Sequence, residues 1–272
     1  MGGRLSGDSS DRDFSWLDWS RVADVTSEGR LILFDESGEA AGSHTLVYVQ
    51  NTADRSIVRL GEGVAMAFAP DGRSALLATE DRRHLRFVPV AGGPTRDLPD
   101  AGLTYQWAKF FPDGERILAL ASEPRKGLRL YVRPLSGSAP QRLGPEMMIR
   151  NAAISPDGAT VAVLSADNRL LLFPTAGGAP RTLAATEPLA PLRWSPAGDT
   201  IFVQHLRRSG ELPARISGIR VSDGRLTLWR EIAPRDLMGV DSVTGVIVCA
   251  DGESLVYSYR RTLSELFLVE GW

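Results

Sequence analysis

The sequence predicts an all-β fold, a six-bladed β-propeller whose ring is closed by an N-terminal strand. Three observations predict it. A strand-turn-strand unit recurs six times, its turn glycines recur at nearly constant spacing, and no segment keeps a 3.6-residue apolar period long enough for a helix. Successive turn glycines are 43, 42, 44, 40 and 54 residues apart, and they are Gly29, Gly72, Gly114, Gly158, Gly198 and Gly252. That spacing is typical of propeller blades.

The composition of the turns explains the recurring motif, which is clearest in Ala69-Pro70-Asp71-Gly72. Proline sets φ near −65° at the first corner, aspartate accepts local backbone hydrogen bonds, and glycine takes the position with φ > 0. Each unit continues with a third strand, a Gly-rich turn and a short fourth strand. Four short antiparallel strands per unit indicate a blade. A β-sandwich also strings short strands together, but it gives no reason for a constant period of about 43 residues.

The repeats divide the chain into six blades. Their expected ranges are about 17–60, 61–100, 101–146, 147–186, 187–236 and 237–272. The last unit has expected strands at 244–248, 255–259 and 266–269 and no fourth. The segment 11–16 precedes the first unit where a fourth strand belongs, so we expect it to complete the sixth blade. Deleting residues 1–16 should then destabilise the ring by exposing sheet edges.

The overall composition excludes some classes of partner and structure. The 272 residues carry a net charge of −2, which argues against nucleic acid, because phosphate binding relies on clustered Lys and Arg. The single cysteine, Cys249, cannot form an intrachain disulfide. No apolar run is long enough for membrane insertion, and residues 1–10 do not resemble a signal peptide. The compartment stays open, and the polar start would also suit a piece of a longer protein.

The Ala69-Pro70-Asp71-Gly72 and Ser155-Pro156-Asp157-Gly158 turns resemble those of the TolB-type six-bladed propeller repeat of bacterial proteins. The first unit lacks the proline, the fifth has Ala197 for aspartate and the sixth has Ala250 for proline. The motif is structural and carries no catalytic residue.

Three further segments, 13–20, 105–114 and 257–264, resemble the C-terminal propeller region of bacterial eukaryotic-like serine/threonine kinases. This resemblance implies a sensor or interaction module of a larger bacterial signalling protein, and it allows an extracytoplasmic location. The kinase motifs themselves are absent: the sequence has no Gly-rich phosphate loop, no His-Arg-Asp and no Asp-Phe-Gly.

The sequence contains no recognisable catalytic or metal-binding motif, so we predict no cofactor, no metal and no enzyme activity. His44, His84 and His205 fall in different units at no shared ligand spacing, and no Gly-x-Ser-x-Gly elbow exists. The alternative is a hydrolase or lyase that uses carboxylates of the central channel as acid and base. The carboxylates considered for it are Asp18, Glu62 and Asp241.

The expected function is the binding of a protein, peptide or small molecule at the rim of the central channel, in the loops that lead into each first strand. Aromatic and polar groups that converge there could hold such a ligand. The candidate residues are Trp19, Arg21, Tyr105, Gln106, Arg150, Asn151 and Asp241. A TolB-like accessory protein of the cell envelope is a further alternative.

Overall fold

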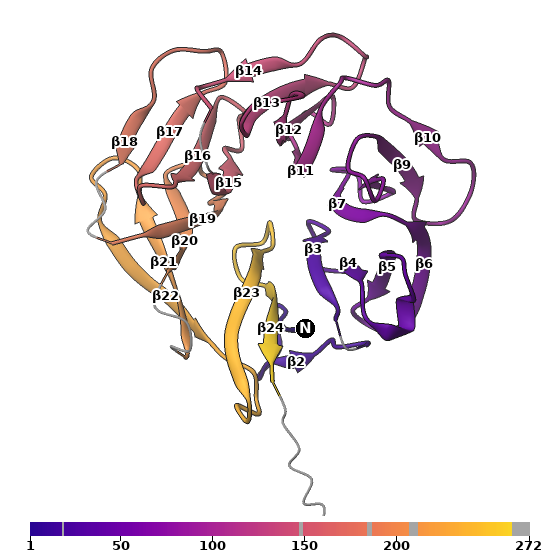
Figure 1. The fold of residues 1–272 in the computed structure, drawn as a ribbon. Helices are drawn as coiled ribbons and strands as arrows, with labels where there is room; N and C mark the ends of the chain where they lie inside the picture. The colour runs from indigo at the N-terminus through magenta and orange to yellow at the C-terminus, as the bar shows by residue number, and fades with distance from the viewer. Residues whose placement is uncertain (18, 147–148, 184–186, 207–211, 263–272) are drawn as a thin grey trace, which may run out of the picture.

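Six four-stranded antiparallel sheets surround a single axis, which confirms the six-bladed all-β propeller (Figure 1). The computed structural model describes residues 1–17, 19–146, 149–183, 187–206 and 212–262. Its one helical element is the short 3-10 helix η1 (Glu39–Ala41), counted over those residues. In the same part of the chain, no helix has the length and apolarity to cross a membrane.

The first five blades use their strands in chain order, from the axis outward. Blade 1 contains β3 (Arg21–Val25), β4 (Leu31–Glu36), β5 (Leu46–Asn51) and β6 (Ile57–Glu62). Blade 2 contains β7 (Val64–Phe68), β8 (Ser74–Ala78), β9 (Leu85–Pro89) and β10 (Arg96–Asp97). Blade 3 contains β11 (Thr104–Phe110), β12 (Arg116–Ser122), β13 (Arg129–Pro134) and β14 (Gln141–Leu143). Blade 4 contains β15 (Ile149–Ile154), β16 (Thr160–Ser165), β17 (Leu170–Pro174) and β18 (Arg181–Leu183). Blade 5 contains β19 (Leu189–Trp194), β20 (Thr200–His205), β21 (Ala214–Arg220) and β22 (Leu226–Ile232).

The sixth blade is assembled from both ends of the chain. It contains β23 (Val240–Val248), β24 (Leu255–Arg261), β1 (Gly2–Arg4) and β2 (Arg12–Asp13), in this order from the axis. Closure by the N-terminal segment is therefore confirmed, with β2 as the outer strand. Residues before 11 supply a further strand that the sequence did not predict, β1, which pairs with β24 and lies between it and β2. The expected strand at 266–269 lies outside the described residues.

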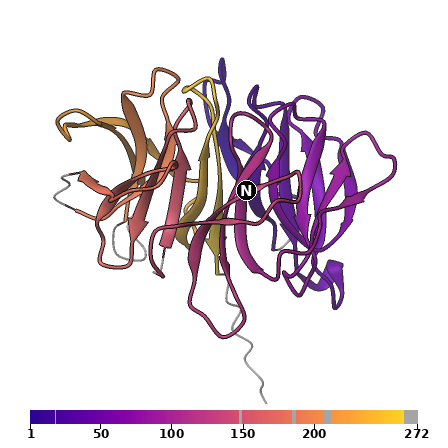
Figure 2. The same cartoon turned by 90° about the horizontal axis from the view of Figure 1, so that it is seen from above.

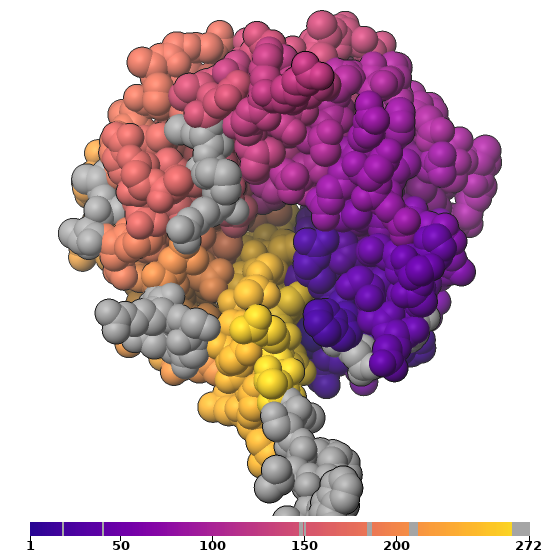
Figure 3. Space-filling view, in the orientation of Figure 1, coloured from indigo at the N-terminus to yellow at the C-terminus, as the bar shows by residue number. Residues whose placement is uncertain are grey.

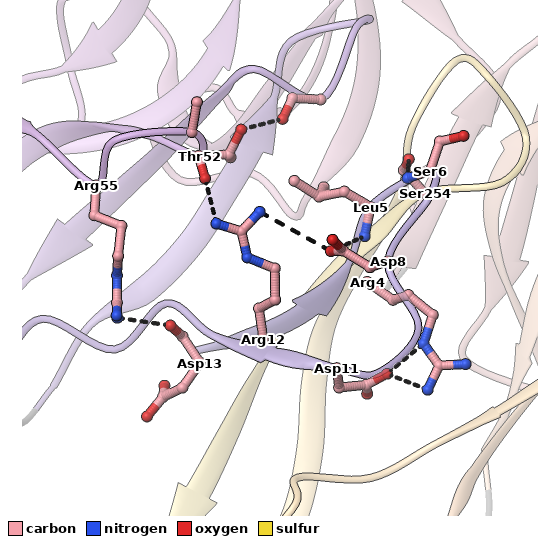
Figure 4. A network of polar contacts seen from close by, with 12 residues as sticks. Arg4, Leu5, Ser6, Asp8, Asp11, Arg12, Asp13, Thr52, Arg55 and Ser254 are labelled. Atoms are coloured by element: carbon pink, nitrogen blue, oxygen red, sulfur yellow. Dashed lines mark hydrogen bonds and ion pairs between the residues drawn. The ribbon is translucent and has the colours of Figure 1, made fainter.

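Polar contacts of the N-terminal segment join the sixth blade to the first (Figure 4). The Ser6 N–H donates to Ser254 Oγ at 2.8 Å in blade 6. On the other side, Arg12 Nη2 donates to the carbonyl of Thr52 at 2.7 Å in blade 1. Arg4 and Asp11 form an ion pair of 2.7 Å within the segment. Contacts to both neighbours explain how two very short strands can close the ring.

The hydrophobic core is divided among the blade interfaces. Six clusters of buried apolar side chains are present in the described residues, and each joins two adjacent blades. The cluster between blades 6 and 1 includes Phe14 and Val256. Because each cluster is built from two adjacent blades, closing the ring buries apolar surface at every blade interface.

The turn between the first and second strands of each blade has the geometry that its composition predicts. In blade 2 the Gly72 N–H donates to the Ala69 carbonyl at 2.8 Å, and Asp71 Oδ1 accepts from the Arg73 N–H at 2.9 Å. Gly72 has φ +67°, a conformation that glycine adopts without strain. These six turns lie on one face, here named the turn face. Because neighbouring strands are antiparallel, the loops that lead into the first strands lie on the opposite face, here named the loop face. Figure 2 shows the ring edge-on, with connections at both faces.

Candidate functional site: the central channel

A cavity of about 510 Å³ lies on the axis, at the turn-face end of the channel. The last residues of all six first strands and the turns after them line this cavity. In the space-filling view the blades pack closely around this axis (Figure 3). Equivalent turn residues, two before each turn glycine, contribute to the lining and define the rim: Ser27, Pro70, Pro112, Pro156, Pro196 and Ala250.

Charge alternates from blade to blade inside the cavity. The fifth residue before the turn glycine lines it in every blade, and these residues are Asp24, Ala67, Lys109, Ala153, Arg193 and Ile247. Blades 1, 3 and 5 carry the charged members, Asp24, Lys109 and Arg193, here named the channel charges. Blades 2, 4 and 6 carry apolar members. With all three ionised, the described residues that line the cavity carry one more positive than negative charge.

Each channel charge is hydrogen-bonded to the first strand of the next blade. Asp24 Oδ2 accepts from the Phe68 N–H at 2.8 Å in β7. Lys109 Nζ donates to the Ala152 carbonyl at 2.8 Å in β15. Arg193 Nη1 donates to the Val248 carbonyl at 3.4 Å in β23. The innermost strand of a blade has no neighbour on its axial side, so these side chains satisfy backbone groups that face the channel.

Irregular pairing helps to place these side chains. The register between the first and second strands shifts in all six blades. In β3 the shift lies between Val22 and Asp24, and in β19 it lies between Pro191 and Arg193. Such bulges bend a strand locally and redirect its side chains. In blades 1 and 5 the charged residue comes directly after the shift.

Burial opposes the ionisation of two channel charges. It lowers the pKa of Lys109 to about 8, although the carboxylate of Asp24 partly counteracts this effect. Burial also raises the pKa of Asp24, against the opposite influence of the Phe68 and Val25 N–H groups and the positive charges of Lys109 and Arg193. The three charges are therefore close enough to affect one another, and the pKa of Lys109 is about 8.

The seven residues proposed from the sequence begin the first strands or precede them, toward the loop face. The Trp19 side chain is 69% exposed, and the backbone N–H of Trp19 donates to Glu36 Oε1 at 2.9 Å. Arg21 forms an ion pair of 2.6 Å with Asp35. Asp241 pairs with Arg260 at 2.8 Å.

Of the other four candidates, Tyr105 is fully buried and accepts a hydrogen bond from Arg133, whereas Gln106 is exposed. The backbone of Arg150 lies in β15, and its side chain is outside the described part. Asn151 Oδ1 accepts from Lys109 Nζ at 3.4 Å, so this candidate contacts a channel charge. None of the seven is among the described residues that line the cavity.

The carboxylates considered for catalysis are not brought together in the described part of the chain. Asp18 lies outside it. Glu62 ends β6, where its side chain is 55% exposed beside Arg59 at 3.4 Å. Asp241 is the second residue of β23, the first strand of blade 6. Within the described ranges, no group of three or more His, Cys, Asp or Glu side chains could hold a metal ion.

One constellation that the sequence did not single out connects Ser217, His205 and Glu187 in blade 5. His205 Nε2 lies 2.7 Å from Ser217 Oγ, and His205 Nδ1 lies 3.1 Å from Glu187 Oε1. The order of groups is that of a nucleophile, a base and an orienting carboxylate. Ser217 is 3% exposed and lies within β21. In this position the three groups connect β20 and β21 with the chain before β19.

Residues 130–222 match the protein-family model described as Lipoprotein LpqB beta-propeller domain. The matched segment runs from β13 in blade 3 to just beyond β21 in blade 5. A search of curated protein sequences found no match to this chain.

Solved structures resemble most of the ring. A putative TolB from Agrobacterium tumefaciens aligns with a TM-score of 0.72 at 15% identity, over 93% of this chain and 95% of that chain. TolB from Acinetobacter baumannii aligns with a TM-score of 0.63 at 16% identity, over 81% of this chain and 56% of that chain. An oligogalacturonate lyase in complex with manganese aligns with a TM-score of 0.62 at 15% identity, over 86% of this chain and 68% of that chain. At these identities the likeness shows a shared fold.

Proposed function

We propose that this chain is a non-enzymatic binding propeller, whose ligand or protein partner docks at the turn-face end of the central channel. The cavity of about 510 Å³ supports this proposal most, because it has a size typical of ligand sites and combines an apolar lining with a few polar groups. The propeller folds of TolB and the partial match to the LpqB domain agree with a role as an interaction module.

A pair of photo-cross-linking variants tests where the partner docks. A photoreactive residue at Ser27 lies on the rim of the cavity, and one at Gln106 is also exposed but lies nearer the loop face. After irradiation in cells of the source bacterium, we expect adducts from position 27 and none from position 106. Adducts from position 106 alone would instead support the loop face, and adducts from neither position would contradict the proposal.

The channel offers a poor arrangement for acid–base catalysis. Asp24 is the one carboxylate among the described residues that line the cavity, and both its oxygens accept backbone hydrogen bonds, from Val25 and Phe68. Hydrolysis or elimination generally requires a positioned acid and a positioned base. Incubation with oligogalacturonate and manganese should therefore give no unsaturated product, and product formation that depends on Asp24 would establish the lyase alternative.

We further propose that the module belongs to a larger bacterial signalling protein, such as a eukaryotic-like kinase. The sequence similarity of segments 13–20, 105–114 and 257–264 supports this assignment. The complete reading frame tests it: a kinase or DNA-binding domain before residue 1 agrees with the proposal. A separate frame with a signal peptide would favour the TolB-like envelope protein.

A further inference from the structure

The two positive channel charges have only neutral hydrogen-bond acceptors in the described part of the chain. Lys109 Nζ contacts the Ala152 carbonyl and Asn151 Oδ1, and Arg193 Nη1 contacts the Val248 carbonyl. Both side chains are partly buried, and removing a cation even in part from water is costly unless an anion compensates it. Asp24 supplies one negative charge, which its own backbone contacts hold beside β7. Asp251, which Arg193 also influences, lies outside the lining and accepts hydrogen bonds from Ser254. One further negative charge would therefore balance the charges of the described lining residues.

The order of the blades indicates where that charge fits. Lys109 Nζ contacts blade 4 and Arg193 Nη1 contacts blade 6, and these two blades flank blade 5. Asp24 Oδ2 contacts blade 2, which lies opposite blade 5 in the ring. An anion near blade 5 would thus lie between two cations and away from the carboxylate.

The remaining lining is largely apolar. Met66, Phe110, Ile154, Leu192 and Val246 contribute to it. Such walls favour a hydrocarbon body over a hydrated inorganic ion. A second negative charge on the ligand would remain uncompensated and would approach Asp24. The chemistry therefore selects a single carboxylate attached to a small apolar body.

We propose that the central channel binds a small organic monocarboxylate, with its carboxylate between Lys109 and Arg193 and its apolar body along the axis. This inference rests on the proposed binding function and specifies its ligand class. The carboxylate could belong to a free small molecule or to the C-terminus of a partner peptide, because both present the same group.

Calorimetric titration of the purified chain at pH 7 tests the proposal with benzoate and hexanoate as probes. We expect saturable binding that weakens at least tenfold in Lys109→Gln and in Arg193→Gln. Arg86→Gln is the matched control, since this exposed arginine lies outside the cavity. Adipate and inorganic phosphate should bind at least tenfold more weakly than hexanoate. A hydrophobic tetrapeptide with a free carboxylate, compared with its amide, distinguishes a peptide terminus from a free ligand.

The pH profile of benzoate binding provides a second readout, in a variant that keeps the positive charge. The charged groups that act on Lys109 are Asp24 and Arg193. Affinity should fall as the pH rises through about 8, where Lys109 loses its proton, and this fall should disappear in Lys109→Arg.

Absence of binding by every monocarboxylate, or binding unchanged in both Gln variants, would overturn the inference. Equal affinity for adipate or phosphate would overturn the assigned ligand class. Cross-links from position 27 to a partner, together with absent carboxylate binding, would refute this inference alone and leave the proposed function in place.

Discussion

The carboxylate of Asp24 accepts a hydrogen bond of 2.8 Å from the backbone N–H of Phe68, so a side chain of blade 1 satisfies the axial edge of blade 2. Replacement by alanine leaves this N–H without its partner, which costs about 1–3 kcal/mol for a buried donor. Asp24→Asn keeps an acceptor oxygen and removes the desolvated charge. We therefore expect Asp24→Ala to be clearly less stable than Asp24→Asn in urea unfolding. Equal stabilities would show that the Phe68 contact contributes nothing.

Closure of the ring depends on the absence of a side chain at Gly3 in β1. A Cβ atom there would lie 2.6 Å from the Leu255 carbonyl oxygen and 3.2 Å from the Phe14 ring. Gly3→Ala should reduce the free energy of unfolding by about 1–3 kcal/mol, as overpacking does elsewhere. In the control Gly127→Ala, the nearest atom belongs to the flexible Glu146 side chain, at 3.0 Å. If thermal melting shows the same loss in both variants, crowding in β1 is not the cause.

The N-terminal segment also shows where sequence reasoning reached its limit. The outer strand β2 could be expected, because a unit that lacks a fourth strand needs one from the other end of the chain. Strand β1 could not, since Met1-Gly2-Gly3-Arg4 has neither β-branched residues nor alternation. Its place depends on the large partners Tyr257 and Phe14, which leave room only for glycine.

Part of the candidate site can be predicted from the sequence repeat. Turn composition and glycine spacing predict the propeller, because each turn must be built from a few residue types. The same alignment places Asp24, Lys109 and Arg193 at one position of the unit, five residues before the turn glycine. Charged residues in an expected innermost strand are the sequence feature that indicates a polar site in the channel. The sequence favours the loops instead, because spacing alone does not show which end of the channel is hollow.

The Ser217–His205–Glu187 constellation gives opposite expectations for a structural and a catalytic role. Because Ser217 is 3% exposed within a strand, a fluorophosphonate reagent should not label the native protein. Ser217→Ala should cost about 1 kcal/mol of stability, the usual contribution of one hydrogen bond. Intact-mass spectrometry measures the labelling. A phosphonylated Ser217 that disappears in His205→Ala would instead favour the hydrolase alternative.

Lys109 should give this protein a measurable pH dependence of stability. Its pKa is lowered by burial to about 8, below the ordinary value of 10.5, so the folded state disfavours the charged amine. Between these two values the unfolded chain binds more protons than the folded chain, and stability therefore rises with pH through this window. Below pH 8 the full cost of the buried charge is present.

Comparison with Lys109→Met isolates this contribution in urea unfolding at pH 7, 8, 9 and 10. Loss of the Ala152 hydrogen bond changes the free energy of unfolding of the variant by the same amount at every pH. Loss of the buried charge raises that free energy most at pH 7. The stability of the wild-type protein relative to Lys109→Met should therefore increase from pH 8 to 10. Lys126→Met is the control, because Lys126 is the only other lysine and pairs with Glu123 at the surface. If the difference in unfolding free energy between the wild-type protein and Lys109→Met stays constant with pH, Lys109 is fully solvated in the channel.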